Sequence, residues 1–116
     1  MKKVYHLSSC GTCQGIIRDN GLDEKGFAFQ DIKTEKIRPA QLDEMRKLAG
    51  SYEALFSRRA IKYKSLGLKD VHLTEQDYRR YILEEYTFLK RPVIIHGGKI
   101  FVGSERKNIE ALKASL

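Results

Sequence analysis

Two cysteines separated by two residues are the side chains of this sequence best suited to covalent chemistry. They are Cys10 and Cys13, and the chain has no others. The spacing lets one thiol attack the other once oxidised, and a helix starting at the pair would lower the pKa of the first thiol through its exposed N–H groups. We therefore expect Cys10 to be the attacking thiolate and Cys13 to resolve the mixed disulfide or sulfenic acid formed on it.

Other interpretations of these residues remain open. The two thiols would be inert if both were buried, but a coincidental Cys-x-x-Cys motif is rare at such a position. A zinc site of Cys10, Cys13 and His6 lacks a fourth ligand, because the other two histidines lie in distant segments, and we expect no metal. His6, four residues before Cys10, is either structural or tunes the thiolate.

Length and composition limit what the cysteines can belong to. The chain has 116 residues, 41% hydrophobic and 32% charged, as expected for one soluble globular domain. It shows neither a membrane-length apolar run nor a secretory signal, so we expect a cytoplasmic protein with no membrane partner. In that reducing compartment a cysteine pair is more often catalytic, regulatory or metal-binding than structural.

The chain carries a net charge of +7, which either reflects a solvated basic surface or favours anionic partners. The basic pairs are scattered, and no aromatic-basic motif accompanies them, so we do not expect direct nucleic-acid binding. These pairs are Arg58-Arg59, Arg79-Arg80 and Lys90-Arg91.

The elements that position the cysteines begin with strands on either side of them. Residues Lys3 to Leu7 favour extended structure, and Ser8-Ser9 end the run. The helix that starts at the cysteines should end at Asn20-Gly21, a dipeptide suited to a left-handed cap. Residues 26–32 predict a second strand, which completes a βαβ unit of the parallel, right-handed kind.

The rest of the chain is a helical block followed by a hairpin and a helix. Apolar spacing and helix-ending glycines predict helices over residues 39–49, 52–56, 62–67 and 75–88, the last of them opened by a capping box from Thr74 to Asp77. Strands over residues 91–96 and 99–103 should meet at the hairpin turn Gly97-Gly98. A final helix capped by Ser104 should carry Ile109, Leu112 and Leu116 along one face.

This order of elements, with Cys-x-x-Cys at the first strand-to-helix turn and a proline opening the ββα unit, resembles a thioredoxin fold with a helical insertion. We therefore predict the α/β class, with a βαβ unit, a ββα unit and a mixed four-stranded sheet. Residues 1–116 would form a single domain whose helical insertion lies at about residues 36–89.

Three segments identify the chain as a member of the arsenate reductase (ArsC) and Spx family. They resemble the nucleophile loop, the central segment and the C-terminal signature of that family, in chain order. The segments are Tyr5-His6 with Ser9-Cys10-Gly11-Thr12, Leu55-Phe56-Ser57-Arg58-Arg59 with Tyr63 and Leu66-Gly67-Leu68, and Lys90-Arg91-Pro92-Val93-Ile94-Ile95 with Val102-Gly103. The resemblance implies that Pro92 is a cis proline facing the cysteine loop.

In the arsenate reductases that the chain resembles, a cysteine thiolate attacks arsenate, arginines bind the oxyanion, and glutathione with glutaredoxin completes the cycle. Cys10 falls on the nucleophile position and Arg91 on one oxyanion arginine. Ser57 and Val102 fill the other two arginine positions, although Arg58-Arg59 lies next to the first and leaves a replacement open. Because several cations normally hold a tetrahedral oxyanion, we expect weak or absent arsenate reduction.

Two functions follow from the resemblance. The first is a thiol-disulfide reductase without a bound cofactor that uses glutathione as co-substrate, with glutaredoxin or a protein disulfide as partner. The second is a redox-sensing transcriptional regulator, because the Spx branch resembles this chain in its cysteine pair, in the placement of Ser57 and Arg59 and in the Arg-Pro-Val-Ile-Ile run. Spx proteins bind the C-terminal domain of the RNA polymerase alpha subunit, and the helical block would then form part of the docking surface.

Overall fold

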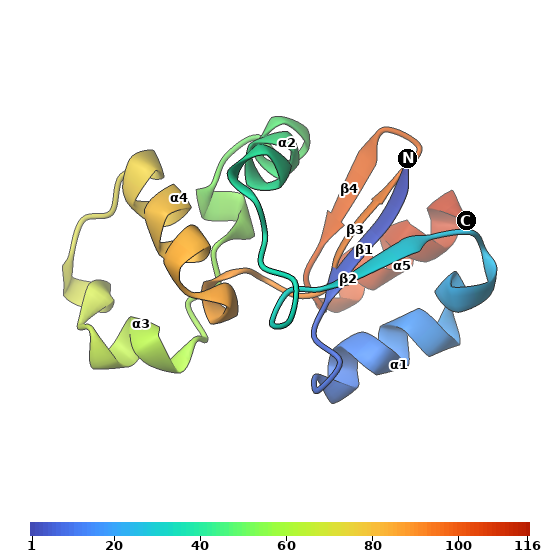
Figure 1. The fold of residues 1–116 in the computed structure, drawn as a ribbon, viewed down its shortest axis with the longest axis horizontal. Coiled ribbons are helices and arrows are strands. Elements are labelled where there is room, and N and C mark those ends of the chain that lie inside the picture. The colour runs from blue at the N-terminus through green and yellow to red at the C-terminus, as the bar shows by residue number, and fades with distance from the viewer. The chain divides into compact units, whose positions relative to one another are not determined.

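The computed structural model describes residues 1–116 and divides the chain into two compact units (Figure 1). Unit 1 consists of residues 1–36 and 91–116, and unit 2 consists of residues 37–90. Unit 2 covers nearly the same residues as the helical insertion expected from the sequence. That the whole chain acts as one domain stays a prediction.

Unit 1 contains a mixed four-stranded sheet. Its strands are β1 (Lys2–His6), β2 (Ala28–Asp31), β3 (Val93–His96) and β4 (Lys99–Val102), in the order β2-β1-β3-β4. β1 runs parallel to β2 and antiparallel to β3, and β3 runs antiparallel to β4. The predicted βαβ and ββα units are therefore confirmed, including the hairpin turn at two glycines with positive φ, Gly97 and Gly98.

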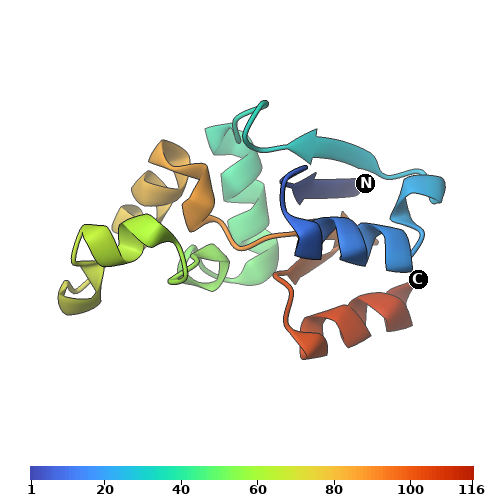
Figure 2. The same ribbon diagram turned by 90° about the horizontal axis from the view of Figure 1, so that it is seen from below.

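One row of side chains across the sheet supports the helix that follows the cysteines. Phe29, Val4, Ile94 and Phe101 are register partners on four adjacent strands, so their side chains share one face. The helices α1 (Gly11–Asp19) and α5 (Arg106–Ser115) lie on one side of the sheet (Figure 2). The core between these elements is a cluster of buried residues: Val4, Ile16, Ile17, Leu22, Phe27, Ile94, Phe101 and Leu112.

In unit 1 the sequence correctly predicts the end of α1, but it misplaces the start of α5. After α1, Gly21 adopts the left-handed φ of 61° that the Asn-Gly dipeptide predicts, and the short 3-10 helix η1 (Leu22–Glu24) follows. The prediction that Ser104 caps the last helix was wrong, since Glu105 is the cap residue of α5. Gly103, with a φ of 88°, turns the chain there, and Asn108 donates to its carbonyl, which delays the first helical turn.

Unit 2 consists of helical segments. They are α2 (Pro39–Ala49), η2 (Glu53–Leu55), α3 (Ile61–Ser65), η3 (Leu68–Asp70), α4 (Glu75–Glu84) and η4 (Tyr86–Phe88). The capping box at Thr74 and Asp77 is present.

The helix predicted over residues 75–88 ends earlier than expected. α4 stops at Glu84 because Glu85 is extended, with φ −140° and ψ 111°. Beyond this break Phe88 stacks on Phe56 with ring centroids 5.0 Å apart, and Ser57 N donates to Phe88 O. The aromatic contact and the backbone bond replace the helical turn that spacing alone predicts. No helix of the structure combines the length and the apolar content needed to span a membrane.

The packing of α5 gives a test of the unit 1 core. Leu112 is 1% exposed, so Leu112→Ala should lower the free energy of unfolding by about 2–4 kcal/mol through lost burial and the cavity left behind. Urea denaturation followed by circular dichroism measures this change. Leu116→Ala is the matched control, because Leu116 is 40% exposed and its truncation should cost less than about 0.5 kcal/mol. Equal losses in the two variants would contradict the assigned core.

Candidate functional site

Cys10 occupies the N-cap position of α1, as the sequence predicts. Its sulfur accepts a hydrogen bond from Cys13 N at 3.4 Å, and its carbonyl accepts one from Gln14 N at 3.1 Å. Cys10 N in turn donates to Leu7 O at 3.0 Å, which closes the turn between β1 and the helix. A thiolate at this position therefore faces the unpaired N–H groups and the positive end of the helix dipole.

The pKa of Cys10 lies below its ordinary value. Partial burial by itself would raise this pKa, but hydrogen bonds from the Cys13 thiol, from Cys13 N and from Thr12 N, together with the charge of Arg91, outweigh the burial. Cys10 is only partly buried, so a reactant can approach its sulfur. A partly exposed thiol with a lowered pKa has the properties of an attacking nucleophile.

Cys13 has the opposite character. It is fully buried on the inner side of α1, and that burial, together with the hydrogen bond to Cys10 and the negative charge of Cys10, raises its pKa to about 12. Both cysteines are free thiols in the structure. Cys13 therefore stays protonated and donates a hydrogen bond to the Cys10 sulfur. These properties fit a resolving thiol, which reacts only after Cys10 has done so.

Asp31, the last residue of β2, fixes the loop before Cys10. Its Oδ2 accepts a hydrogen bond from Ser8 Oγ at 2.6 Å and a longer one from Ser8 N at 3.4 Å. The bonds from Ser8 Oγ and from Lys33 N hold the pKa of Asp31 below its ordinary value. The sequence analysis did not identify this residue, although the predicted parallel pairing of the two strands would have placed their ends side by side.

Gln14 fixes the loop from the other side. Its side-chain Nε2 donates to Leu7 O at 2.9 Å and to His6 Nδ1 at 3.1 Å. Gln14 lies one helical turn after Cys10, so it reaches back over the loop that carries the nucleophile. The contact gives His6 a structural role in holding Gln14. That His6 also tunes the thiolate stays a prediction.

Arg91 precedes β3 and reaches the cysteine pair electrostatically. The Arg91–Pro92 peptide bond is cis, as the resemblance implies, and Pro92 O accepts a hydrogen bond from Gly103 N at 2.8 Å. The positive charge of Arg91 contributes to the lowered pKa of Cys10, and at Cys13 it opposes the larger rise that burial causes. The structure therefore brings together all three residues that the sequence singled out.

The residues at the two other arginine positions are also described. Val102 is the last residue of β4 and pairs with Val93. Ser57 belongs to unit 2, where its Oγ accepts a hydrogen bond from Arg59 N at 3.3 Å. Arg58 donates to Glu53 Oε2 at 2.9 Å and to the Tyr78 hydroxyl at 3.1 Å, so its guanidinium is engaged within unit 2.

The electrostatics of the pair predict a selective alkylation. Iodoacetamide should modify Cys10 before Cys13, with a pH midpoint below that of a free cysteine, because only the thiolate reacts. Arg91→Ala should move this midpoint upward, since the loss of a positive charge disfavours the thiolate, and Arg91→Lys should move it less. Peptide mass spectrometry after timed alkylation from pH 5 to 10 measures both effects.

Lys99→Ala is the control for Arg91, because it removes one positive charge from an exposed position of β4. It should leave the midpoint of Cys10 unchanged. An equal upward shift in the two variants would assign the effect to overall charge and contradict a local role of Arg91. Faster alkylation of Cys13 than of Cys10 would contradict the order of the two pKa values.

Comparisons with known proteins agree with this geometry. The family model described as "ArsC family" matches residues 5–112. The chain is 27% identical over 115 residues to an arsenate reductase of Neisseria meningitidis serogroup A, covering 95% of this chain and 96% of that one. It is 25% identical over 111 residues to the uncharacterized protein YusI of Bacillus subtilis, covering 91% and 92% of the two chains.

Solved structures show the same fold. An arsenate reductase from Vibrio cholerae superposes with a TM-score of 0.75 at 20% identity, covering 99% of this chain and 97% of that one. An arsenate reductase related protein from Brucella melitensis superposes with a TM-score of 0.72 at 23% identity, covering 95% and 92% of the two chains. The fold is thioredoxin-like, and the family match covers both cysteines and Arg91, so the chain belongs to the ArsC family.

Proposed function

We propose that this protein is a thiol–disulfide oxidoreductase in which Cys10 attacks and Cys13 resolves, with glutathione as the reducing co-substrate. The observation that carries the proposal is that the two thiols differ in opposite directions in exposure and in pKa. Cys10 is partly exposed with a lowered pKa, whereas Cys13 is buried with a pKa raised to about 12. Membership of the ArsC family, whose relatives include proteins named arsenate reductases, supports thiol chemistry at this position.

In the first step the Cys10 thiolate attacks one sulfur of a substrate disulfide. A new S–S bond forms between Cys10 and that sulfur, the old S–S bond breaks, and the other half of the substrate leaves as a thiolate that takes a proton from water. The N–H groups of Cys13 and Thr12 and the charge of Arg91 stabilise the attacking thiolate. These groups lower the pKa of Cys10, so a larger share of this thiol is ionised at a given pH than of an ordinary cysteine.

In the second step Cys13 attacks the sulfur of Cys10. Two of the causes that raise the pKa of Cys13 are its hydrogen bond to Cys10 and the negative charge of Cys10, and both end once Cys10 is in a mixed disulfide. The charge of Arg91, which lowers this pKa, remains. Formation of the mixed disulfide therefore makes Cys13 easier to deprotonate, and the Cys10–Cys13 disulfide forms as the second thiolate leaves.

Glutathione would then return the pair to its reduced form. One glutathione thiolate attacks the Cys10–Cys13 disulfide at Cys10 and frees Cys13, and a second attacks the resulting mixed disulfide and leaves as glutathione disulfide. Glutaredoxin or a protein disulfide would be the partner in this exchange. We propose that arsenate is a poor substrate, because only Arg91 remains of the three expected oxyanion arginines and Arg58 is engaged by Glu53.

Single-cysteine variants test the order of attack. On mixing with glutathione disulfide, wild-type protein should form the Cys10–Cys13 disulfide, because Cys13 displaces the bound glutathione. Cys13→Ser should stop at one stable glutathione adduct, and Cys10→Ser should react more slowly by at least about tenfold, since its remaining thiol is buried and protonated. Intact-mass spectrometry of acid-quenched samples measures the three outcomes. A Cys10→Ser variant that reacts as fast as the wild type would contradict the assignment of Cys10 as the attacking thiol.

A second candidate function is a redox-dependent regulator that binds the C-terminal domain of the RNA polymerase alpha subunit. The observation that favours it is an exposed segment of unit 2, residues 59–71, which we term the basic-apolar segment. Ile61 is 85% exposed, Leu66 54% and Val71 50%, and three exposed lysines lie between or beside them. Exposed apolar side chains flanked by cations are suited to an acidic protein surface.

A pull-down with the purified alpha C-terminal domain of the source organism tests this second function. Binding should differ between the reduced protein and the protein with a Cys10–Cys13 disulfide, and Ile61→Glu should abolish it. Leu48→Glu is the control, because Leu48 is 38% exposed but lies on α2, outside the basic-apolar segment. If neither redox state binds, the regulator function is wrong, while the oxidoreductase function stands on its own assays.

A further inference from the structure

Leu7, the residue that follows β1, hydrogen-bonds to three residues at the start of α1. Its backbone N–H donates to the Cys13 sulfur. Its carbonyl accepts one hydrogen bond from Cys10 N at 3.0 Å and a second from Gln14 Nε2 at 2.9 Å. Leu7 is only 7% exposed, so its backbone bonds are shielded from much of the solvent. The backbone of this one residue therefore contacts both cysteines and Gln14.

The bond from Leu7 acts on the resolving thiol. Burial raises the pKa of Cys13 to about 12, and among the effects that oppose this rise the backbone bond from Leu7 is larger than the charge of Arg91. A hydrogen bond donated to the charged form of a group favours that form. The N–H of Leu7 therefore stabilises the thiolate of Cys13, which is the species that must attack Cys10 in the second step.

The side-chain amide of Gln14 has one orientation that suits both of its neighbours. Leu7 O can only accept a hydrogen bond, so the amide nitrogen must face it. The same nitrogen lies 3.1 Å from His6 Nδ1, which accepts its second N–H. The two bonds join α1 to the last residue of β1 and to the residue after it. Gln14 therefore holds the end of β1 against the start of the helix.

Gln14 is also the part of this junction that takes no part in covalent chemistry. The other bond to Leu7 O comes from Cys10, whose sulfur carries the substrate in the mixed disulfide and must then bond to Cys13. The backbone of Cys10 can shift as its sulfur changes partner, whereas Gln14 forms no covalent bond at any step. The bond from Gln14 Nε2 is therefore available to Leu7 in every redox state of the pair.

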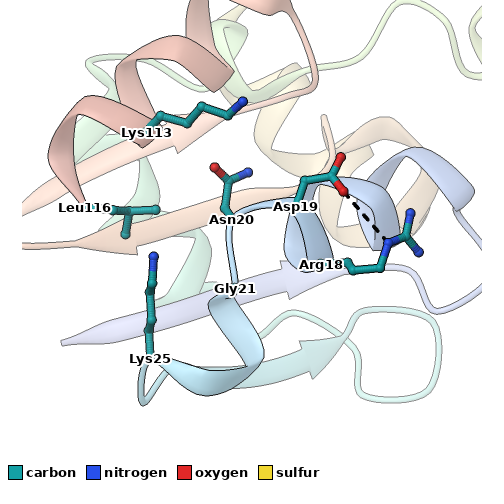
Figure 3. Close-up of a pocket in the computed structure, with 7 residues that line it drawn as sticks. All are labelled: Arg18, Asp19, Asn20, Gly21, Lys25, Lys113 and Leu116. Carbon is teal, nitrogen blue, oxygen red and sulfur yellow. Dashed lines mark ion pairs between the residues drawn. The ribbon is translucent and has the colours of Figure 1, made fainter.

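The opposite end of α1 offers no comparable link to the thiols. A hollow of about 580 Å³ lies there (Figure 3), and no residue of the cysteine loop lines it. Its side chains from α1 form their ion pair and hydrogen bond within the helix. Arg18 pairs with Asp19 at 3.8 Å. The Asn20 amide donates to the preceding turn, at Ile16 O, over 2.8 Å. Apart from the cysteines, Gln14 is therefore the side chain through which α1 hydrogen-bonds to the end of β1.

We propose that Gln14 is a positioning residue for the second step of the exchange, because it holds Leu7 so that the N–H of Leu7 stabilises the Cys13 thiolate. The inference rests on the proposed function and adds the groups that act on its resolving thiol. Cys13 gives its proton to water, and its thiolate attacks the Cys10 sulfur. The Cys10–Cys13 bond forms, the bond from Cys10 to the substrate breaks, and the substrate leaves as a thiolate that takes a proton from water. Cys13 is oxidised in this step, and the departing substrate sulfur is reduced.

Single-turnover kinetics test the proposal. Excess methyl methanethiosulfonate places a methylthio group on Cys10, and Cys13 then displaces methanethiol. Quenched-flow samples read by intact-mass spectrometry give the two rate constants separately. Gln14→Met keeps the length of the side chain and removes its hydrogen bonds, so the displacement constant should fall about fivefold. The constant for the first attack should stay within about twofold, because the Cys10 sulfur receives its hydrogen bonds from Cys13 and Thr12.

Two further variants control for general effects. Gln76→Met makes the same substitution at an exposed position of α4 in unit 2, and it should leave both constants unchanged. Arg91→Ala should lower both constants, because its charge acts on both cysteines. Equal falls of the two constants in Gln14→Met would assign the effect to the fold of α1. That result, or an unchanged displacement constant, would overturn the inference.

The pH dependence of displacement gives a readout that a purely structural role would not move. The displacement constant should rise with pH as Cys13 ionises. The loss of a group that favours the thiolate should shift this rise to higher pH in Gln14→Met and leave it in place in Gln76→Met. Measurements from pH 6 to 10 decide the point, and identical profiles in the wild type and Gln14→Met would contradict the assigned role.

A titration without redox chemistry separates failure of this inference from failure of the proposed function. In Cys10→Ser the only thiol is Cys13, so the ¹H–¹⁵N signal of Leu7 should move as that thiol ionises. The signal should stay in place when Cys13→Ser is added. A Leu7 amide that ignores Cys13 would overturn the inference and leave the exchange assays standing. If the wild type exchanges with no disulfide, the proposed function fails, while the titration still decides whether the Leu7 N–H faces Cys13.

Discussion

The hydrogen bond from Cys13 N to the Cys10 sulfur is the interaction on which the rest of the site depends. It exists because Cys10 occupies the first turn of α1, where backbone N–H groups have no carbonyl partner within the helix. The same three-residue separation places Cys13 on the buried side of the helix, next to the partly buried sulfur of Cys10. One backbone geometry thus produces both the thiol with the lowered pKa and its protonated partner, and Arg91 adds a positive charge from a distant part of the chain.

The sheet and the core hold that geometry in place. The row from Phe29 to Phe101 provides an apolar surface, and Ile16 and Ile17 pack α1 against it, which holds the start of the helix in place. Ser8 and Gln14 then tie the connecting loop to β2 and back onto itself. The alternation of strand and helix therefore has a chemical result: a short loop is fixed at both of its ends while its sulfur stays accessible.

Much of this arrangement follows from sequence patterns. Helix-ending glycines, the Thr74 capping box and the two-glycine hairpin are local signals, and each was confirmed because short-range hydrogen bonds determine them. The errors have a different origin. α4 ends at Glu84 because Phe88 stacks on Phe56, a contact across more than thirty residues that periodicity does not contain. The Asp31–Ser8 bond was missed for the same reason. The two residues are far apart in the sequence and come together only when β1 pairs with β2.

The Asp31–Ser8 bond also bears on how the thiol responds to acid. A carboxylate whose pKa is depressed in the folded protein keeps its contribution until the pH falls through that depressed value. The pKa of Asp31 starts from the ordinary range of an aspartate and is lowered further, so this carboxylate is charged at neutral pH. The tie between the cysteine loop and the end of β2 is consequently in place at neutral pH, and it is lost only when strong acid protonates Asp31.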